Sequence, residues 1–142
     1  MANEKPLAVQ TLCEVFGGQL VGSHFLSEKG LLKRDPNPKD WDVVVPENFF
    51  LVSIAYLKKK GWVRQKTYRQ KRYGTETIKL DTFEKGGILI DLFPIEEGKI
   101  ITIADALEHK RFLSKQDPSK IPADVIEKHH KDFLEFLDLL KG

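Results

Sequence analysis

The sequence predicts an α/β domain of the α+β kind, in which a mixed sheet is flanked by helices and followed by a pair of C-terminal helices. A length of 142 residues, of which 41% are hydrophobic, suits one domain with its own core. Apolar residues recur at helical spacing in some segments and in β-branched or alternating runs in others, which indicates both kinds of element. Only helical patterns follow residue 98, so we expect the sheet within residues 1–98 and the helical pair within residues 99–142.

The chain opens with a predicted helix and a short strand. The apolar residues that we expect on the buried side of this helix are Leu7, Leu12, Val15 and Phe16. Gly17-Gly18 should end the helix, because glycine is common just past helix ends. Residues 19–21 then form a short strand.

A glycine and a proline-containing loop separate this strand from the next one. Gly22-Ser23 closes the first strand, and residues 24–29 form a helical turn. The loop over residues 34–38 contains two prolines, which exclude a regular helix or a central strand. The β-branched run at residues 40–45 predicts a largely buried strand, which the following proline stops.

A helix and three strands should complete the sheet layer. The predicted helix spans residues 47–60, with Phe50, Ile54 and Leu57 on one face and Gly61 after its last turn. The expected strands are residues 62–65, 76–83 and 88–93. The Glu-Lys-Gly-Gly turn before the last strand favours a hairpin.

Two helices are expected at the C-terminus. Thr102 is suited to cap a helix over residues 103–115, and Asp117-Pro118 separates it from a second helix over residues 121–141. The apolar residues expected to form the buried stripe of the second helix are Phe133, Phe136, Leu137 and Leu140.

Composition limits the classes of protein to which the chain can belong. The formal net charge of +2 is too small to indicate nucleic-acid or membrane binding by itself. Cys13 is the only cysteine, so no intramolecular disulfide or cysteine cluster for zinc is possible. No apolar run approaches the roughly 18 residues that a membrane span requires. We therefore expect a cytoplasmic protein without a membrane partner.

Two aspartates in the strand at residues 40–45 are candidate metal ligands. Side chains alternate between the faces of a strand, so Asp40 and Asp42 project to one side and Trp41 to the other. Two like charges side by side are costly unless a cation lies between them, and a divalent metal is the usual partner. The alternative is a pair of solvated aspartates at the exposed start of a strand.

Asp91 is a lone charge in an apolar strand, with hydrophobic neighbours on both sides. A buried carboxylate without a partner would be energetically expensive there. If this strand lies beside the one that carries Asp40 and Asp42, three carboxylates converge and can hold two Mg²⁺ ions. The alternative is an edge-strand aspartate paired with a lysine. Gly22-Ser23 lies at the end of a strand and the start of a helical turn, where backbone N–H groups can approach phosphate oxygens, although a plain turn has the same sequence.

In their order along the chain, these features resemble the DNA polymerase beta-type nucleotidyltransferase superfamily. The matching segments are Val21-Gly22-Ser23, Asp40-Trp41-Asp42-Val43-Val44-Val45 and Ile90-Asp91-Leu92-Phe93. The resemblance implies that Asp40 and Asp42 ligate Mg²⁺ or Mn²⁺ and that Asp91 completes the catalytic metal site. It also implies that Gly22 and Ser23 hold the phosphates of a nucleoside triphosphate. Trp41 departs from the family, which has a smaller aliphatic residue there.

The resemblance further implies transfer of a nucleoside monophosphate to an acceptor hydroxyl with release of pyrophosphate. The sequence does not identify this acceptor, which can be a nucleic acid, a protein or a small molecule. Lys110, on the first C-terminal helix, is a candidate nucleotide-binding residue, although a solvated helix face is the simpler expectation. His24 is expected at a surface turn, and the adjacent His129 and His130 are poorly spaced for a shared metal.

A basic stretch supports a second hypothesis, that of a non-catalytic module with this fold that binds nucleic acid or a protein partner. Eight Lys or Arg residues and no Asp or Glu lie between residues 51 and 75. The candidate contacts are Lys60, Arg64, Arg69 and Arg72. Such a stretch, interleaved with aromatic residues, can contact phosphates and stack bases. It can also be a solvated helix end followed by the face of a hairpin.

Overall fold

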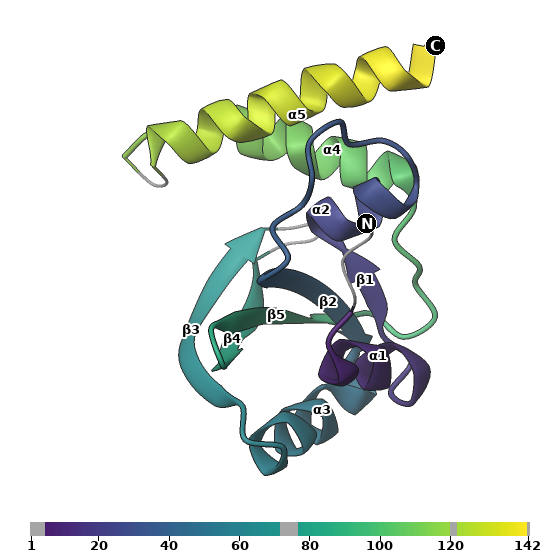
Figure 1. Ribbon diagram of the computed structural model, residues 1–142, viewed down its shortest axis with the longest axis vertical. Coiled ribbons are helices and arrows are strands. Elements are labelled where there is room, and N and C mark those ends of the chain that lie inside the picture. Colours follow the sequence, from purple (N-terminus) through teal and green to yellow (C-terminus); the bar gives the residue numbers. More distant parts are fainter. Residues whose placement is uncertain (1–4, 72–76, 120–121, 142) are drawn as a thin grey trace.

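The computed structural model describes residues 5–71, 77–119 and 122–141 (Figure 1). The helices within these ranges are α1 (Leu7–Glu14), α2 (Gly22–Glu28), α3 (Glu47–Lys59), α4 (Ile103–Ser114) and α5 (Ala123–Lys141). The strands are β1 (Gln19–Val21), β2 (Asp40–Pro46), β3 (Val63–Lys71), β4 (Thr77–Lys85) and β5 (Ile88–Ile95). The predicted class, a sheet with flanking helices and a C-terminal helical pair, is confirmed.

The strands form one mixed sheet in the order β1-β2-β5-β4-β3. β2 and β5 run parallel, and the other neighbouring pairs are antiparallel. A parallel pair needs a long crossover connection, which α3, β3 and β4 supply here. This topology places the two strands that carry the predicted aspartates side by side.

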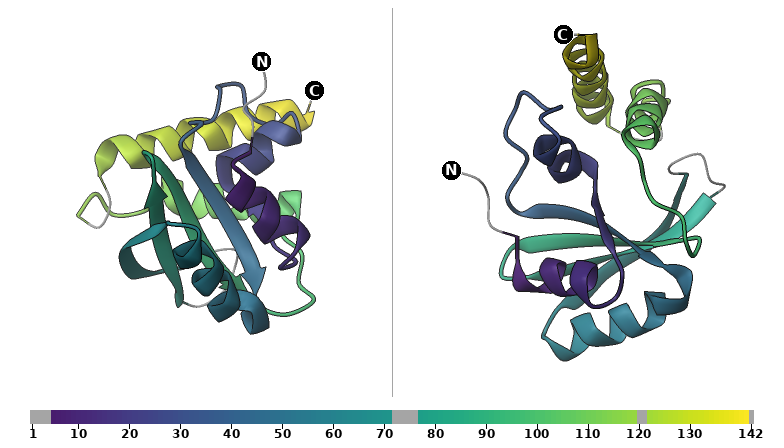
Figure 2. Two further views of the ribbon diagram at one scale, coloured as in Figure 1. Left: turned by 60° about the horizontal axis from the view of Figure 1, so that its bottom comes forward. Right: turned by 90° about the vertical axis from the view of Figure 1, so that its right-hand side faces the viewer.

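Helices cover both faces of the sheet, as the side-on view shows (Figure 2). α1 and α3 lie on one face, and their apolar side chains pack against those of the strands. The largest fully buried members of this core are Leu12, Trp41, Leu57, Phe83, Ile90 and Leu92. Because alternate residues of β2 point to opposite faces, burial of Trp41 and Val43 in this core turns Asp40 and Asp42 toward the other face.

On that other face, α2 packs against the C-terminal helical pair. Phe25 of α2, Ala106 of α4 and Phe136 of α5 belong to one buried cluster. Gln19 of β1 makes two hydrogen bonds to the segment before α4. Its side-chain amide donates to the carbonyl of Ile101 at 2.7 Å and accepts from the N–H of Ile101 at 2.8 Å. The helical pair is thereby held on the side of the sheet that bears the aspartates.

The buried side of α1 differs from the prediction. Leu7 and Val15 are 74% and 67% exposed, whereas Ala8 and Val9 are buried. Only Leu12 is buried as expected, and Phe16 packs partly against the core. The inward face of α1 therefore carries Ala8, Val9 and Leu12, and not the larger apolar residues Leu7 and Val15.

The buried stripe of α5 is also displaced by one residue. Phe136 is fully buried as predicted, but Leu140 is 49% exposed. The inward positions are Asp132, Phe136 and Leu139, which follow the i, i+4, i+7 spacing of one helix face. The prediction missed this face because it begins with an aspartate, whose charge is paired inside the structure.

The hairpin strands are longer than the pattern indicated. β3 runs over nine residues to Lys71 and not only to residue 65, because pairing with β4 stabilises a polar segment that shows no alternation. The predicted positions Glu76, Ile121 and Arg72 lie outside the described residues. In the ranges that the structure describes, no helix is both long and apolar enough to cross a membrane.

Candidate functional site

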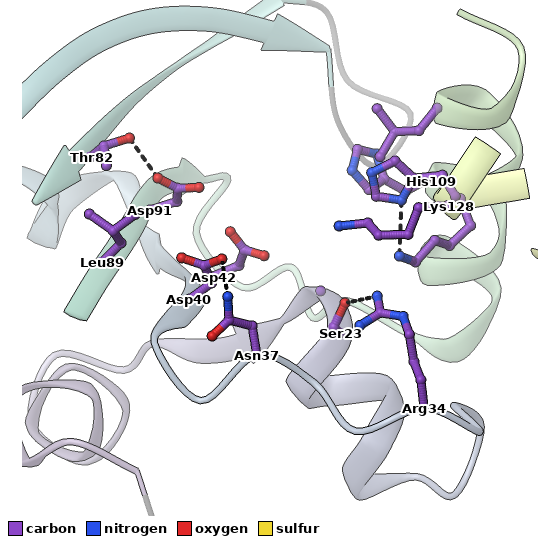
Figure 3. A pocket seen from close by; sticks show the side chains of 14 residues that line it. Ser23, Arg34, Asn37, Asp40, Asp42, Thr82, Leu89, Asp91, His109 and Lys128 are labelled. Carbon is purple, nitrogen blue, oxygen red and sulfur yellow. Dashed lines mark hydrogen bonds between the residues drawn. The ribbon is translucent and has the colours of Figure 1, made fainter. Parts of the chain in front are cut away.

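A cavity of about 340 Å³ lies between the sheet and the C-terminal helices (Figure 3). Carboxylates of β2 and β5 line the sheet wall, and cationic and imidazole side chains line the helix wall. The polar side chains of the sheet wall belong to Asp40, Asp42, Thr82 and Asp91, and those of the helix wall to His109, Lys110, Lys128 and His129. The cavity thus has one acidic wall and one largely basic wall.

Parallel pairing of β2 with β5 sets the geometry of the acidic wall. Asp42 lies directly opposite Asp91 in the register, and Asp40 lies opposite Leu89. Neighbouring strands are about 4.8 Å apart, so the side chains of Asp42 and Asp91 begin close together on one face. The conditional expectation that these two strands are neighbours is confirmed.

Hydrogen bonds orient the carboxylates of Asp40 and Asp91. The Asn37 side-chain amide donates to Asp40 Oδ2 at 3.0 Å. The hydroxyl of Thr82, on β4, donates to Asp91 Oδ1 at 2.6 Å. Thr82 also lies opposite Asp91 in the strand register. The sequence analysis did not identify Thr82 as a site residue, because only the strand pairing reveals its contact with Asp91.

Gly22 is required where it lies because Asp42 packs against its backbone. Gly22 has a φ of +72°, in the left-handed region that favours glycine. A Cβ at this position would overlap Asp42 Oδ2 and lie 3.2 Å from Asp42 Cγ. Gly22 and Ser23 are the first two residues of α2 and not a separate turn before it. Both line the cavity.

The helix wall contains a buried ion network centred on Asp132 of α5. Its carboxylate accepts hydrogen bonds from Lys110 Nζ at 2.9 Å and from Arg34 Nε and Nη2 at 3.0 and 2.9 Å. Arg34 Nη2 also donates to Ser23 Oγ at 3.0 Å, and Lys110 Nζ lies 3.1 Å from His129 Nδ1. Four elements, namely α2, the loop before β2, α4 and α5, therefore meet in this network.

Burial and pairing shift the ionisation of the two central groups in this network. Burial lowers the pKa of Lys110, and the adjacent Asp132 carboxylate opposes this effect. For Asp132, burial would raise the pKa, but the hydrogen bonds from Arg34 and the charge of Lys110 outweigh it and lower the pKa from 3.8 to about 2. The simpler expectation of a solvated Lys110 is wrong, since this residue is only 4% exposed.

Trp41 and His24 shape the loop that leads into β2. Their rings stack, with centroids 3.6 Å apart and planes 7° from parallel. Trp41 Nε1 donates to the carbonyl of Pro38 at 2.9 Å, and His24 Nε2 lies 2.8 Å from the carbonyl oxygen of Asn37. His24 is buried, so its expected place at a surface turn is wrong. The large residue at position 41 thus supports the loop that carries Asn37 to Asp40.

The structure does not bring the described basic candidates to the cavity. Lys60 follows the last turn of α3, at the far end of β3 from the C-terminal helices (Figure 1). Arg64 Nη2 makes an ion pair with the buried Asp81 at 3.3 Å. Neither residue lines the cavity. Arg69 lies on β3, and Arg72 lies outside the described residues.

The acidic wall fits a divalent cation by donor type. Its carboxylate oxygens are the ligands that Mg²⁺ prefers, and all three aspartates border one cavity. Across residues 5–71, 77–119 and 122–141, however, no three His, Cys, Asp or Glu side chains are gathered closely enough to form a metal-binding group. Asp40, Asp42 and Asp91 are therefore adjacent along the wall without being drawn together around one point.

Comparison of the chain with protein-family models, with curated proteins and with solved structures found no match. The geometry of the cavity and the order of the sequence motifs are therefore the observations that bear on function.

Proposed function

We propose that this protein is a metal-dependent nucleotidyltransferase, which transfers a nucleoside monophosphate from a nucleoside triphosphate to an acceptor hydroxyl. The observation that carries the proposal is the position of Asp42 opposite Asp91 on two parallel strands, with Asp40 on the same face of the sheet. The resemblance of the surrounding motifs to the DNA polymerase beta-type superfamily supports the same reaction.

The charges of the two walls suit a metal-bound triphosphate. Asp40, Asp42 and Asp91 would hold Mg²⁺ or Mn²⁺ on the sheet side. Lys110 and Lys128 line the opposite wall, where cations stabilise phosphate oxygens. A cavity of about 340 Å³ lies at the lower end of the usual range for small-ligand pockets. The acceptor would therefore bind outside the volume that the triphosphate occupies.

In the proposed reaction, the acceptor oxygen attacks the α-phosphorus and the bond from this phosphorus to the bridging oxygen of pyrophosphate breaks. A metal held by Asp40, Asp42 and Asp91 would neutralise phosphate charge and would make the attacking hydroxyl easier to deprotonate. Asp91, oriented by Thr82, accepts the hydroxyl proton. The cationic wall stabilises the negative charge that accumulates on the leaving pyrophosphate.

Transfer of label tests this proposal directly. The protein is incubated with each nucleoside triphosphate labelled at the α-phosphate, with Mg²⁺ or Mn²⁺, and with cell extract as the source of acceptors. We expect metal-dependent transfer that Asp42→Ala abolishes and Asp35→Ala retains, because Asp35 is an exposed residue that does not line the cavity. If no triphosphate binds in a metal-dependent manner, the proposal is wrong.

The same variants separate this proposal from the non-catalytic alternative. A module that binds nucleic acid through residues 58–72 would show salt-sensitive binding that survives loss of all three aspartates. Within the described part of this stretch, Arg64 already pairs with Asp81 and Lys60 lies away from the cavity. These positions favour the triphosphate site over the basic stretch as the functional centre.

A further inference from the structure

Asp132 lies behind the basic wall of the cavity. It does not line the cavity itself but borders a second one of about 330 Å³, which is lined by Arg34 and residues of α5. Arg34 and Lys128 line both cavities and so form the partition between them. Asp132 is only 1% exposed, so its full charge is buried beside two cations.

We propose that Asp132 is a positioning residue that holds Arg34 and Lys110 in the wall so that their positive charge faces the phosphates of the bound nucleotide. This inference rests on the proposed function, because it assigns a polyphosphate to the cavity. Asp132 would thus determine phosphate binding although its side chain does not line the cavity.

The geometry around Arg34 supports a positioning role. Two guanidinium nitrogens bond the two oxygens of Asp132, which is the paired arrangement that fixes the plane of an arginine side chain. In this plane, Nη2 also reaches Ser23 Oγ beside Gly22. Asp132 thus aligns the loop before β2 with the start of α2, where the sequence motif predicts phosphate contacts.

The surroundings of Lys110 support the same role. Only 5% of its side chain is exposed, and burial without an anion would favour the neutral amine. The charged or titratable groups that face it are Lys128, His129 and Asp132 of α5, Arg34 of the loop, and His109 beside it on α4, with Asp40, Asp42 and Asp91 across the cavity. Asp132 is the anion in hydrogen-bond contact with Lys110, so it favours the protonated amine and opposes the effect of burial.

A competing role for Asp132 makes the opposite prediction. If Asp132 only masks the two cations, a phosphate must displace it, and its removal would strengthen the binding of anions. If it positions them, its removal leaves Arg34 free to rotate and Lys110 free to lose its proton. The two roles therefore differ in the sign of the effect on anion affinity.

Binding of inorganic tripolyphosphate without metal, measured by calorimetry, separates the two roles. We expect Asp132→Asn to weaken binding roughly tenfold at pH 9, because loss of the adjacent anion lowers the pKa of Lys110 further and favours the neutral amine. At pH 6, where protonation of the amine is more favourable than at pH 9, the loss should be clearly smaller. A defect that is only structural would not depend on pH in this way.

Asp138→Asn is the matched control for this measurement. Asp138 lies on the same helix and pairs with Lys33 of the same loop at 3.5 Å, but its side chain is 74% exposed. This variant should bind tripolyphosphate as the wild type does at both pH values. Equal or tighter binding by Asp132→Asn would overturn the proposal.

A measurement on the wild-type protein covers the case in which Asp132→Asn does not fold. Arg34 Nε donates to Asp132 Oδ1, so its N–H should give a protected signal in a ¹H–¹⁵N NMR spectrum. Tripolyphosphate should shift this signal while the N–H stays protected from exchange. Loss of protection on binding would mean that the phosphate displaces Asp132, which contradicts a positioning role.

These results can be told apart from failure of the proposed function. Asp42→Ala should retain tripolyphosphate binding in the absence of metal, because Asp42 lies on the opposite wall. If label transfer is absent while tripolyphosphate binding still depends on Asp132, the transferase proposal fails and the role of Asp132 stands. If transfer occurs but Asp132→Asn binds normally, only the role of Asp132 fails.

Discussion

Substitution of Gly22 by alanine should disturb both stability and the acidic wall, and Gly30→Ala provides a matched control. The two glycines share a φ of +72°. A Cβ at Gly30 would meet no atom within 4 Å, whereas one at Gly22 would overlap the carboxylate of Asp42. Both variants therefore carry the same backbone strain, and only one carries the contact.

The magnitudes follow from these two contributions. Placing an L-residue in the left-handed region costs about 1–2 kcal/mol. The free energy of unfolding should therefore fall by this amount in both variants. Gly22→Ala must also rotate Asp42 away from its present position, at roughly 0.5–1.5 kcal/mol for a strained side-chain angle. We therefore expect Gly22→Ala to lower the free energy of unfolding by about 1 kcal/mol more than Gly30→Ala does. Urea denaturation resolves this difference.

A second background isolates the contact itself. In a protein that already carries Asp42→Ala, the carboxylate is absent. In this background Gly22→Ala should lower the free energy of unfolding no more than Gly30→Ala does. Label transfer should be lost in Gly22→Ala and retained in Gly30→Ala, because only the first variant moves a proposed metal ligand. Equal unfolding free energies and equal transfer for the two variants would refute this explanation of Gly22.

Three further substitutions test other parts of the structure. Thr82→Val removes the hydrogen-bond donor to Asp91 and should lower the rate of label transfer roughly tenfold, with triphosphate binding retained. The reason is that a hydrogen bond to a charged group is worth about 1.5–3 kcal/mol. An unchanged rate would show that Asp91 does not need this hydrogen bond for its orientation. Because the pKa of Asp132 is lowered from 3.8 to about 2, its stabilisation is present above pH 4 and is lost as the pH falls toward 2. The wild type should therefore lose about 2 kcal/mol more than Asp132→Asn between pH 5 and pH 2, and parallel pH profiles would contradict this. Gln19→Ala removes both hydrogen bonds to Ile101 and should lower the free energy of unfolding by about 1–3 kcal/mol. Thermal or urea denaturation measures this change. An unchanged free energy of unfolding would mean that other contacts hold the segment before α4.

The sequence was sufficient to predict the elements whose pattern reflects local chemistry. The β-branched run of β2, the threonine cap of α4 and the glycine turn before β5 all lie where they were expected. The adjacency of β2 and β5 was predicted only as a condition, because strand pairing depends on the whole topology. Once that pairing exists, the facing of Asp42 and Asp91 follows from the alternation of side chains.

The helix wall was the least predictable part of the site. Lys110 and Asp132 are 22 positions apart, and no periodic signal distinguishes a buried ion pair from two solvated charges. Asp132 also occupies an inward position of α5 where an apolar residue would be expected. The predicted apolar stripe of this helix was therefore placed one residue away from the buried face. Arg34 lies in a loop, where its partner depends on the packing of α5 against the rest of the chain.

The most direct test of the central claim is a crystal structure with Mg²⁺ and a non-hydrolysable triphosphate analogue. We expect the metal on the carboxylates of Asp40, Asp42 and Asp91, with the phosphates between Gly22-Ser23 and the wall formed by Arg34 and Lys110. A triphosphate bound away from this cavity, or a metal that does not contact Asp42, would contradict the proposed transferase site.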